Sequence, residues 1–117
     1  MRILVSFEPG YLAYQGVIAA SIRILRPHAK VETATLDALA EEVERFDPEL
    51  VICNRPNTVD PGGRMAWVEL SLESTRPSRV CVGGRHSEPT NPTLEALLEV
   101  IDEVEKLTQT NNHLRRC

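Results

Sequence analysis

The chain has 117 residues, of which 42% are hydrophobic and 26% are charged. This length fits one domain with a core of its own and leaves no room for a second full domain. Thirteen Lys and Arg residues stand against seventeen Asp and Glu residues, which gives a formal net charge of −4. Nucleic-acid-binding domains carry an excess of positive charge, so we expect no nucleic-acid partner.

The N-terminal residues are not expected to act as a signal peptide, because the charged Glu8 follows too soon for the apolar segment of one. The longest uncharged stretch, residues 9–22, falls short of the roughly 20 apolar residues that span a membrane. It also contains Gly10, Gln15 and Gly16. We therefore expect a cytoplasmic protein with no membrane partner.

The three cysteines, Cys53, Cys81 and Cys117, form an odd set without CxxC spacing. Cys53 and Cys81 lie in apolar, strand-like runs, where a cysteine behaves as a small hydrophobic residue. We predict buried reduced thiols at these two positions and an exposed thiol at Cys117. The histidines are too scattered along the chain for a zinc site, so we expect neither a metal nor another cofactor.

The first half of the chain alternates strands with helices. Hydrophobic periodicity predicts strands over 2–7, 30–35 and 49–53 and helices over 11–25 and 36–46. Pro27 and Pro48 follow the two helices and end them. The continuous apolar run 49–53 is typical of a strand that is buried on both faces of a parallel sheet.

The second half departs from this alternation. Arg55–Arg64 carries two Pro and two Gly without apolar periodicity, so it predicts a loop. Residues 67–72 and 79–83 alternate as strands around a turn and predict a β-hairpin. A polar loop over 84–91 leads to the last helix, which has Pro92 in its first turn.

This element order predicts an α/β fold, a three-layer α/β/α sandwich around a mostly parallel five-stranded sheet with a C-terminal β-hairpin and a final helix. Right-handed crossovers make the first three strands parallel and start the strand order as 2-1-3. We expect the fourth strand to run antiparallel to the third, so that the fifth strand again runs with the first three. One domain is placed over 1–107 and a flexible C-terminal tail over 108–117.

Open α/β sheets bind ligands outside the C-terminal ends of their parallel strands. In the expected topology, that edge receives the loops after strands one, three and five together with the start of strand four. The candidate ligand-binding residues are Glu8, Asn54, Arg55, Asp60, Arg64, Arg85 and His86. The arginines would clamp a carboxylate or a phosphate, with Glu8 and Asp60 orienting them. The alternative is that these loop arginines are solvated or pair with neighbouring acids.

Asp47–Asn54, the opening strand Ile3-Leu4-Val5 and the βαβαβ order resemble the receiver domain of two-component response regulators over roughly the first half of the chain. In that family an Asp at the position of Asn54 accepts the phosphoryl group, and an acidic pair after the first strand holds Mg²⁺. Here Glu8 alone follows Phe7. An amide is a poor nucleophile and supplies no anionic ligand, so the resemblance implies a pseudo-receiver that is not phosphorylated.

The first helix is unusual because Tyr11–Ile22 contains no charged residue. A surface helix normally shows a polar face, so one interpretation is that this helix packs on the sheet and also on a protein partner, such as a second copy. The interface candidates are Tyr11, Leu12, Tyr14, Val17 and Ile18. The alternative is an outer stripe of small residues that needs no cover.

Two functions remain open on these grounds. The first is a non-enzymatic, receiver-like module that acts by protein–protein contact. Its partner is another protein or a second copy, which would form a homodimer through the first helix. The second is a binding protein or enzyme for a small anionic ligand that uses the arginine-bearing loops. No complete catalytic motif occurs in the sequence, and His86 has no identifiable nucleophile partner, so we name no catalytic residue.

Overall fold

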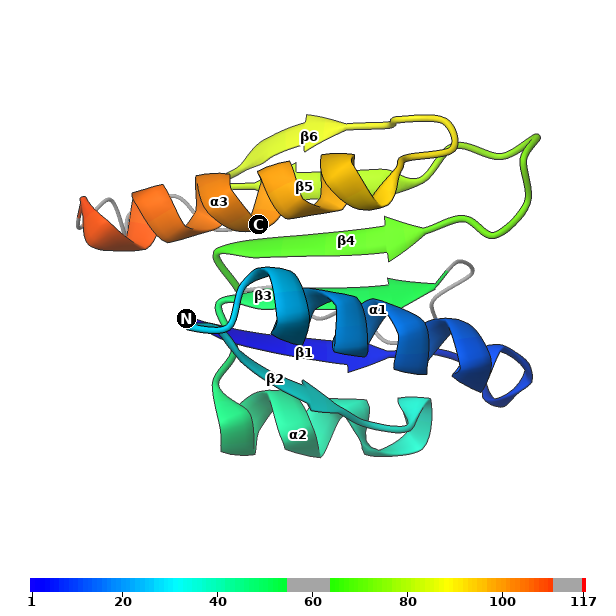
Figure 1. Ribbon diagram of the computed structural model, residues 1–117, viewed down its shortest axis with the longest axis horizontal. Helices are drawn as coiled ribbons and strands as arrows, with labels where there is room; N and C mark the ends of the chain where they lie inside the picture. The colour runs from blue at the N-terminus through cyan, green and yellow to red at the C-terminus, as the bar shows by residue number, and fades with distance from the viewer. Residues whose placement is uncertain (55–63, 111–116) are drawn as a thin grey trace.

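The computed structural model describes residues 1–54, 64–110 and 117, which form a mixed α/β fold (Figure 1). The strands are β1 (Arg2–Ser6), β2 (Lys30–Thr33), β3 (Leu50–Asn54), β4 (Ala66–Leu70), β5 (Arg79–Val82) and β6 (Arg85–Ser87). The helices are α1 (Leu12–Leu25), α2 (Leu39–Phe46) and α3 (Leu94–Gln109), and the short 3-10 helices η1 (Pro9–Tyr11) and η2 (Leu36–Ala38) precede the first two. The predicted α/β class is confirmed.

The strands form one mixed sheet in the order β2-β1-β3-β4-β5-β6. This order confirms the predicted 2-1-3 start, but the sheet has six strands where the sequence predicted five. β4 runs parallel to β3, with Leu50 opposite Ala66, so the predicted antiparallel pairing of these two strands is wrong. The predicted hairpin is confirmed, because β5 runs antiparallel to β4.

The direction of β4 was missed because residues 55–65 show no helical pattern. Parallel neighbours are usually joined by a crossover that contains a helix, whereas antiparallel neighbours need only a loop. A sequence without a helix between two strands therefore favours the antiparallel arrangement. The register from Leu50 with Ala66 to Asn54 with Leu70 shows the parallel one.

The sixth strand lies in a segment that the sequence predicted as a polar loop. Gly83 and Gly84 have φ angles of 57° and 84°, which suit the two-residue hairpin turns whose central residues both need positive φ. The turn brings Arg85 opposite Val82 and starts an antiparallel edge strand. All three residues of β6 are exposed, so the sequence shows no alternation of hydrophobic and polar residues that would predict this strand.

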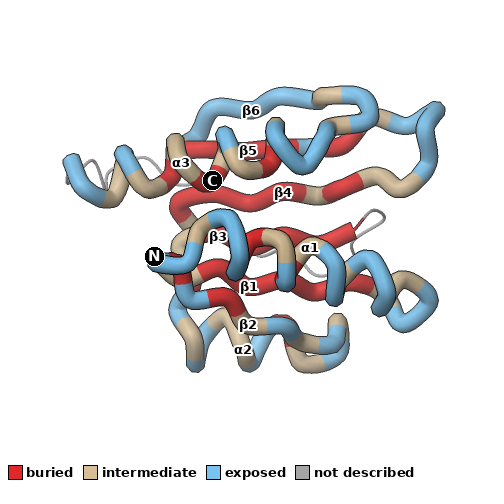
Figure 2. Tube along the Cα trace, in the orientation of Figure 1, coloured by how far each residue is buried: buried red, intermediate tan, exposed pale blue. Residues whose placement is uncertain are grey.

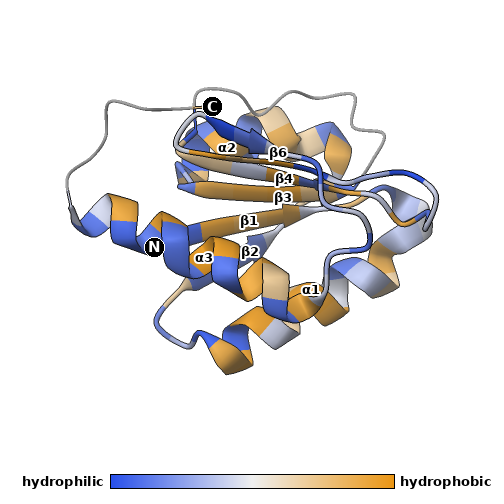
Figure 3. Ribbon diagram, turned by 90° about the horizontal axis from the view of Figure 1, so that it is seen from above, coloured by the Kyte–Doolittle hydropathy of each residue, from blue (hydrophilic) through white to orange (hydrophobic). Residues whose placement is uncertain are grey.

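The residues of the central strands are buried (Figure 2), and their side chains contribute to two core clusters. Ile3 and Val5 belong to a core cluster that includes residues of α1 and α3. Leu4 belongs to a second, smaller cluster with Leu39 of α2. Because side chains alternate along a strand, the helices α1 and α3 cover one face and α2 covers the other (Figure 3). None of the described helices is long and apolar enough to cross a membrane.

Cys81 and Cys117 form a disulfide with a Cα–Cα distance of 6.0 Å. The expected reduced thiol at Cys81 and exposed thiol at Cys117 are therefore wrong, whereas Cys53 keeps a thiol and is buried. Closing a loop with a sequence separation of 36 residues stabilises the folded state by about 4 kcal/mol in the chain-entropy model.

The chain end also differs from the predicted tail. α3 continues to Gln109, two residues past the predicted domain boundary, and the Thr110 N–H caps it by donating to the Lys106 carbonyl. Cys117 is held by its disulfide and by a backbone hydrogen bond of 2.9 Å to the Arg64 carbonyl. The rest of the predicted tail, residues 111–116, lies outside the described residues.

A bidentate ion pair ties the end of α1 to the middle of α3. The Arg26 guanidinium donates to both carboxylate oxygens of Asp102, at 2.7 and 2.8 Å. These hydrogen bonds lower the pKa of Asp102 below its ordinary value of 3.8. Asp102 is 48% exposed, and solvent weakens such pairs, so it contributes up to about 1 kcal/mol.

This pair predicts a specific loss of stability in acid. A carboxyl group with a lowered folded-state pKa stabilises the fold above its unfolded pKa, and that contribution is lost as the pH falls through the folded pKa. Asp102→Asn should therefore lose less stability than the natural protein between pH 6 and pH 3, as measured by urea denaturation. Glu99→Gln, an exposed acid on the same helix, is the matched control. An equal loss in both variants would contradict the role of Asp102.

Candidate functional site

The residues predicted to line one crevice do not lie together. Glu8 and Asn54 meet at the C-terminal ends of β1 and β3, where the Glu8 N–H donates to Asn54 Oδ1 at 2.9 Å. Arg64 precedes β4 and lies at the opposite end of the sheet, because β4 runs parallel to β3. Arg55 and Asp60 lie outside the described residues.

Arg85 and His86 are separated from Asn54 by the same reversal of strand direction. β5 is antiparallel to β4, so it ends where β4 begins, and the Gly83 N–H donates to the Met65 carbonyl at 2.8 Å. Arg85 therefore starts β6 near the beginning of β4. The expectation that the end of the fifth strand shares an edge with the ends of the first and third is wrong.

Asn54, at the end of β3, holds the segment that follows β1. Its side chain is completely buried, and its Oδ1 accepts the hydrogen bond from Glu8 described above. Next to it, the Phe7 N–H donates to Gln15 Oε1 at 2.7 Å. Together these bonds fix the segment between β1 and α1. Asn54 Nδ2 has no hydrogen-bond partner among the described residues.

The two described arginines of the predicted clamp are bound by acids. Arg64 pairs with Asp47 and donates to the Pro48 carbonyl at 3.3 Å. The polar cavity beside Arg64, of about 280 Å³, is lined by both cations and carboxylates. Arg85 pairs with Glu103 of α3. The alternative stated for these arginines, that they pair with neighbouring acids, is confirmed for Arg64 and Arg85.

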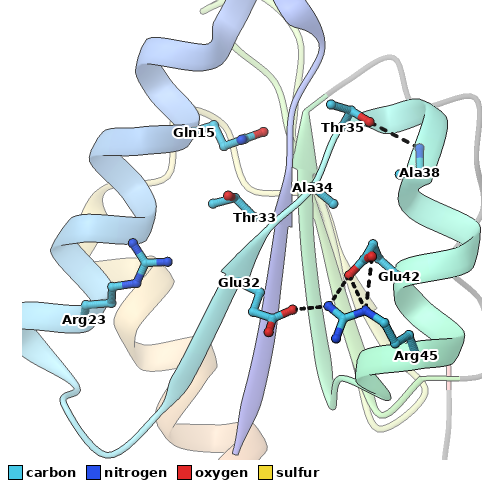
Figure 4. A pocket seen from close by; sticks show the side chains of 9 residues that line it. All are labelled: Gln15, Arg23, Glu32, Thr33, Ala34, Thr35, Ala38, Glu42 and Arg45. Atoms are coloured by element: carbon cyan, nitrogen blue, oxygen red, sulfur yellow. Dashed lines mark hydrogen bonds and ion pairs between the residues drawn. The ribbon is translucent and has the colours of Figure 1, made fainter.

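A groove of about 660 Å³ lies beside β2, the edge strand between α1 and α2 (Figure 4). Gln15, Arg23 and Thr33 lie on the α1 side of this groove, while Glu42 and Arg45 lie on the α2 side. The remaining lining residues are Glu32, Ala34, Thr35 and Ala38. Arg23 donates to the Val31 carbonyl at 2.9 Å and so covers an acceptor of the open edge strand.

The charges in this groove satisfy one another. Arg45 donates to Glu32 at 2.5 Å and also pairs with Glu42. The hydrogen bond from Arg45 lowers the pKa of Glu42, and both carboxylates raise the pKa of Arg45. Glu42 is therefore held in its charged form and is a poor proton carrier.

The groove beside β2 has no arrangement suited to catalysis. Its lining contains neither Cys nor His, and the two threonines have no general base hydrogen-bonded to them among the described residues. No group of His, Cys, Asp and Glu in the described part of the chain is arranged to hold a metal ion. The groove therefore offers a polar surface rather than reactive groups.

A second groove, of about 280 Å³, separates α1 from α3 on the other side of α1. Its lining is mainly apolar and includes Tyr14, Val17 and Ile18 of α1, Leu70 at the end of β4, and Leu97 of α3. Asn91, Pro92 and Thr93 close it near the start of α3. The apolar surface of this groove continues onto the exposed side of α1.

The predicted interface residues differ in exposure. Leu12, Tyr14 and Val17 are 51%, 55% and 65% exposed, whereas Tyr11 and Ile18 are half-buried. Ile24 is 75% exposed, although the sequence did not single it out. α1 thus buries one side on the sheet and leaves the opposite side apolar and open to solvent.

A cluster around the disulfide was missed in the sequence. Trp67 of β4 contacts the edge of the His86 ring at a centroid distance of 6.0 Å, and the Arg79 guanidinium lies over the Trp67 ring at 5.4 Å. Cys81 lies opposite both Trp67 and His86 in the sheet. Three cysteines allow three pairings, and nothing in their spacing selects Cys81 with Cys117.

Comparisons with protein-family models, with curated proteins and with solved structures found no match to this chain. The function therefore has to be inferred from the residues of the chain itself.

The position of Asn54 predicts a measurable loss of stability on its replacement. Asn54→Ala removes the acceptor of the partly buried Glu8 N–H, and the loss of such a hydrogen bond costs about 1 kcal/mol. Urea denaturation should show that loss, while Thr75→Ala, an exposed turn position, should change stability by less than about 0.5 kcal/mol. A loss at Asn54 no larger than that at Thr75 would show that the hydrogen bond contributes nothing.

Proposed function

We propose that this chain is a non-catalytic interaction module that associates with a second copy of itself through α1. The observation that carries the proposal is the solvent-facing side of this helix. Val17 and Ile24 are 65% and 75% exposed, and Ala13 and Ala20 are exposed as well. A helix that is apolar on its outer side as well as its inner side indicates a partner.

The absence of charge favours a second copy as that partner. In a two-fold symmetric contact, residue i meets residue j and residue j meets residue i, so a patch whose charges are all of one sign brings like charges together. Residues 11–22 carry no charge, and Arg23, the one charged residue of α1, lines the groove beside β2 and donates to the Val31 carbonyl. By contrast, the exposed residues Glu41 and Glu44 of α2 and Glu95 and Glu99 of α3 would bring like charges together.

The side chains on the outer side of α1 permit close approach. Ala13, Gly16 and Ala20 recur at helical spacing, and a Cβ atom built on Gly16 meets nothing within 4 Å. Tyr14 and Val17 stand beside this strip and also line the groove between α1 and α3. The small residues and the groove together offer a shaped surface for the α1 helix of the second copy.

We further propose that the module is receiver-like. The strand order β2-β1-β3-β4-β5 is the order of flavodoxin-like folds, to which receivers belong, and it supports the resemblance in the first half of the chain. Asn54 stands where the family has its phosphoacceptor and is buried against Glu8. The antiparallel β5 and the added β6 depart from that family plan.

The self-association predicts an effect of charge on the outer side of α1. Ala20→Glu places a carboxylate in the apolar contact, where residues 11–22 offer it no cationic partner, and should convert the dimer into a monomer. Ala40→Glu introduces the same change at an exposed position of α2 and should leave the dimer intact. Sedimentation equilibrium from about 1 to 100 µM measures both. A natural protein that stays monomeric over this range, or equal dissociation of the two variants, would overturn the proposal.

The second prediction concerns phosphorylation. Incubation with acetyl phosphate and Mg²⁺ should leave the intact mass unchanged, because an Asn side chain forms no acyl phosphate. A known receiver domain treated in parallel verifies the reagent. A stable phosphoryl adduct on this chain would contradict the proposed pseudo-receiver, while the dimer test above would keep its meaning.

A further inference from the structure

The disulfide lies beside a histidine on an exposed edge strand. Cys81 of β5 is bonded to Cys117, and His86 Nε2 lies 3.7 Å from Cys81 Sγ. His86 pairs directly with Cys81 across the antiparallel strands β5 and β6. This pairing places a ring nitrogen beside one sulfur of the disulfide.

The two sulfur-bearing residues differ in their access to solvent. Cys81 is completely buried, whereas Cys117 at the chain end is partly exposed. His86 belongs to β6, whose three residues are all exposed. Attack by a thiol from solution on the more exposed residue, Cys117, would make the sulfur next to His86 the leaving one.

We propose that the Cys81–Cys117 disulfide is a thiol–disulfide exchange site for low-molecular-mass thiols of the glutathione class. A solution thiolate attacks Cys117 Sγ, the S–S bond breaks, and its electron pair leaves on Cys81 Sγ. The products are a mixed disulfide on Cys117 and a Cys81 thiolate, which is protonated by His86 or by water.

A second thiol molecule completes the reaction. Its thiolate attacks the small-molecule sulfur of the mixed disulfide and releases Cys117 as a thiol. The balance is one protein disulfide and two small thiols converted into one protein dithiol and one small disulfide. The reverse sequence, with a small disulfide as the oxidant, closes the bond again.

In this reaction His86 stabilises the thiolate that leaves on Cys81 Sγ. Exchange is faster when the leaving thiolate is stabilised, and an N–H donor or a positive charge beside a sulfur stabilises its thiolate. Nε2 at 3.7 Å from Cys81 Sγ is placed for that hydrogen bond. A hydrogen bond to a charged group changes an equilibrium by about tenfold or more.

The fluorescence of Trp67 can be used to follow the exchange. Trp67 is the only tryptophan in the sequence and belongs to the same buried cluster as Cys81, with Cys117 packed against it. Reduction removes the covalent link between Cys117 and β5, while the Cys117 N–H can still donate to the Arg64 carbonyl. Trp67 fluorescence should therefore change as the disulfide opens.

The experiment uses the full oxidised chain with reduced glutathione as the probe. Trp67 fluorescence follows reduction at fixed pH over a range of glutathione concentrations, and acid-quenched samples are digested to locate the mixed disulfide. The natural protein should be reduced at a rate proportional to glutathione concentration, with the first adduct on Cys117.

Three variants test the role of His86. His86→Phe keeps a ring against Trp67 but has no nitrogen, and His86→Ala removes the ring; both should slow reduction by about tenfold. Both should also shift the equilibrium with glutathione toward the disulfide. Ser87→Ala, on the same strand but on the opposite face of the sheet, should behave as the natural protein. Thermal unfolding of the oxidised forms checks that the variants remain folded.

Two results would overturn the proposal. A reduction rate that does not depend on glutathione concentration would show that the disulfide opens only when the protein unfolds. A first adduct on Cys81 would show that the attack occurs at the other sulfur. If His86→Phe and His86→Ala are both reduced as fast as Ser87→Ala, the assigned role of His86 is wrong.

Discussion

The parallel pairing of β3 with β4 decides which residues of this protein can meet. It sends Arg64 to the end of the sheet where Arg2 and Asp47 lie, and it leaves Asn54 at the other end. Because β5 then runs back along β4, the parallel pairing of β3 with β4 also determines where the disulfide and β6 lie. A reversed β4 would have gathered the predicted arginines around Asn54 instead.

The two faces of the sheet are covered to different extents, and this difference shapes the surface. Both α1 and α3 pack on one face, where they enclose the larger core cluster. They still leave a groove between them, and α1 still exposes apolar side chains such as Val17 and Ile24. α1 therefore carries more apolar surface than the core of its own chain buries, and this surplus is the physical basis for the proposed second copy.

Local patterns were sufficient to predict most of the helices and strands and insufficient to predict how they are joined. The buried strands β1 and β3 and the helices α1, α2 and α3 carry clear hydrophobic periodicity, so their residues were identified to within a few positions. Strand direction after Asn54 and the partner of Cys117 depend on residues far apart in the chain, and no local pattern contains them. β6 has no buried residue, so the hydrophobic signal that defines a strand is missing there.

Because the relative positions of these residues depend on pairings between distant parts of the chain, most of the candidate site was predicted wrongly. Among the described candidate residues, Glu8 and Asn54 meet as expected, because they lie at the C-terminal ends of β1 and β3, which are parallel neighbours. The sheet also keeps the two proposed surfaces apart. α1 packs on the face of Ile3 and Val5, whereas Cys81 packs with Leu39 and Trp67 on the other. The disulfide and the outer side of α1 therefore lie on opposite faces of the sheet, with the buried strands β1, β3 and β4 between them.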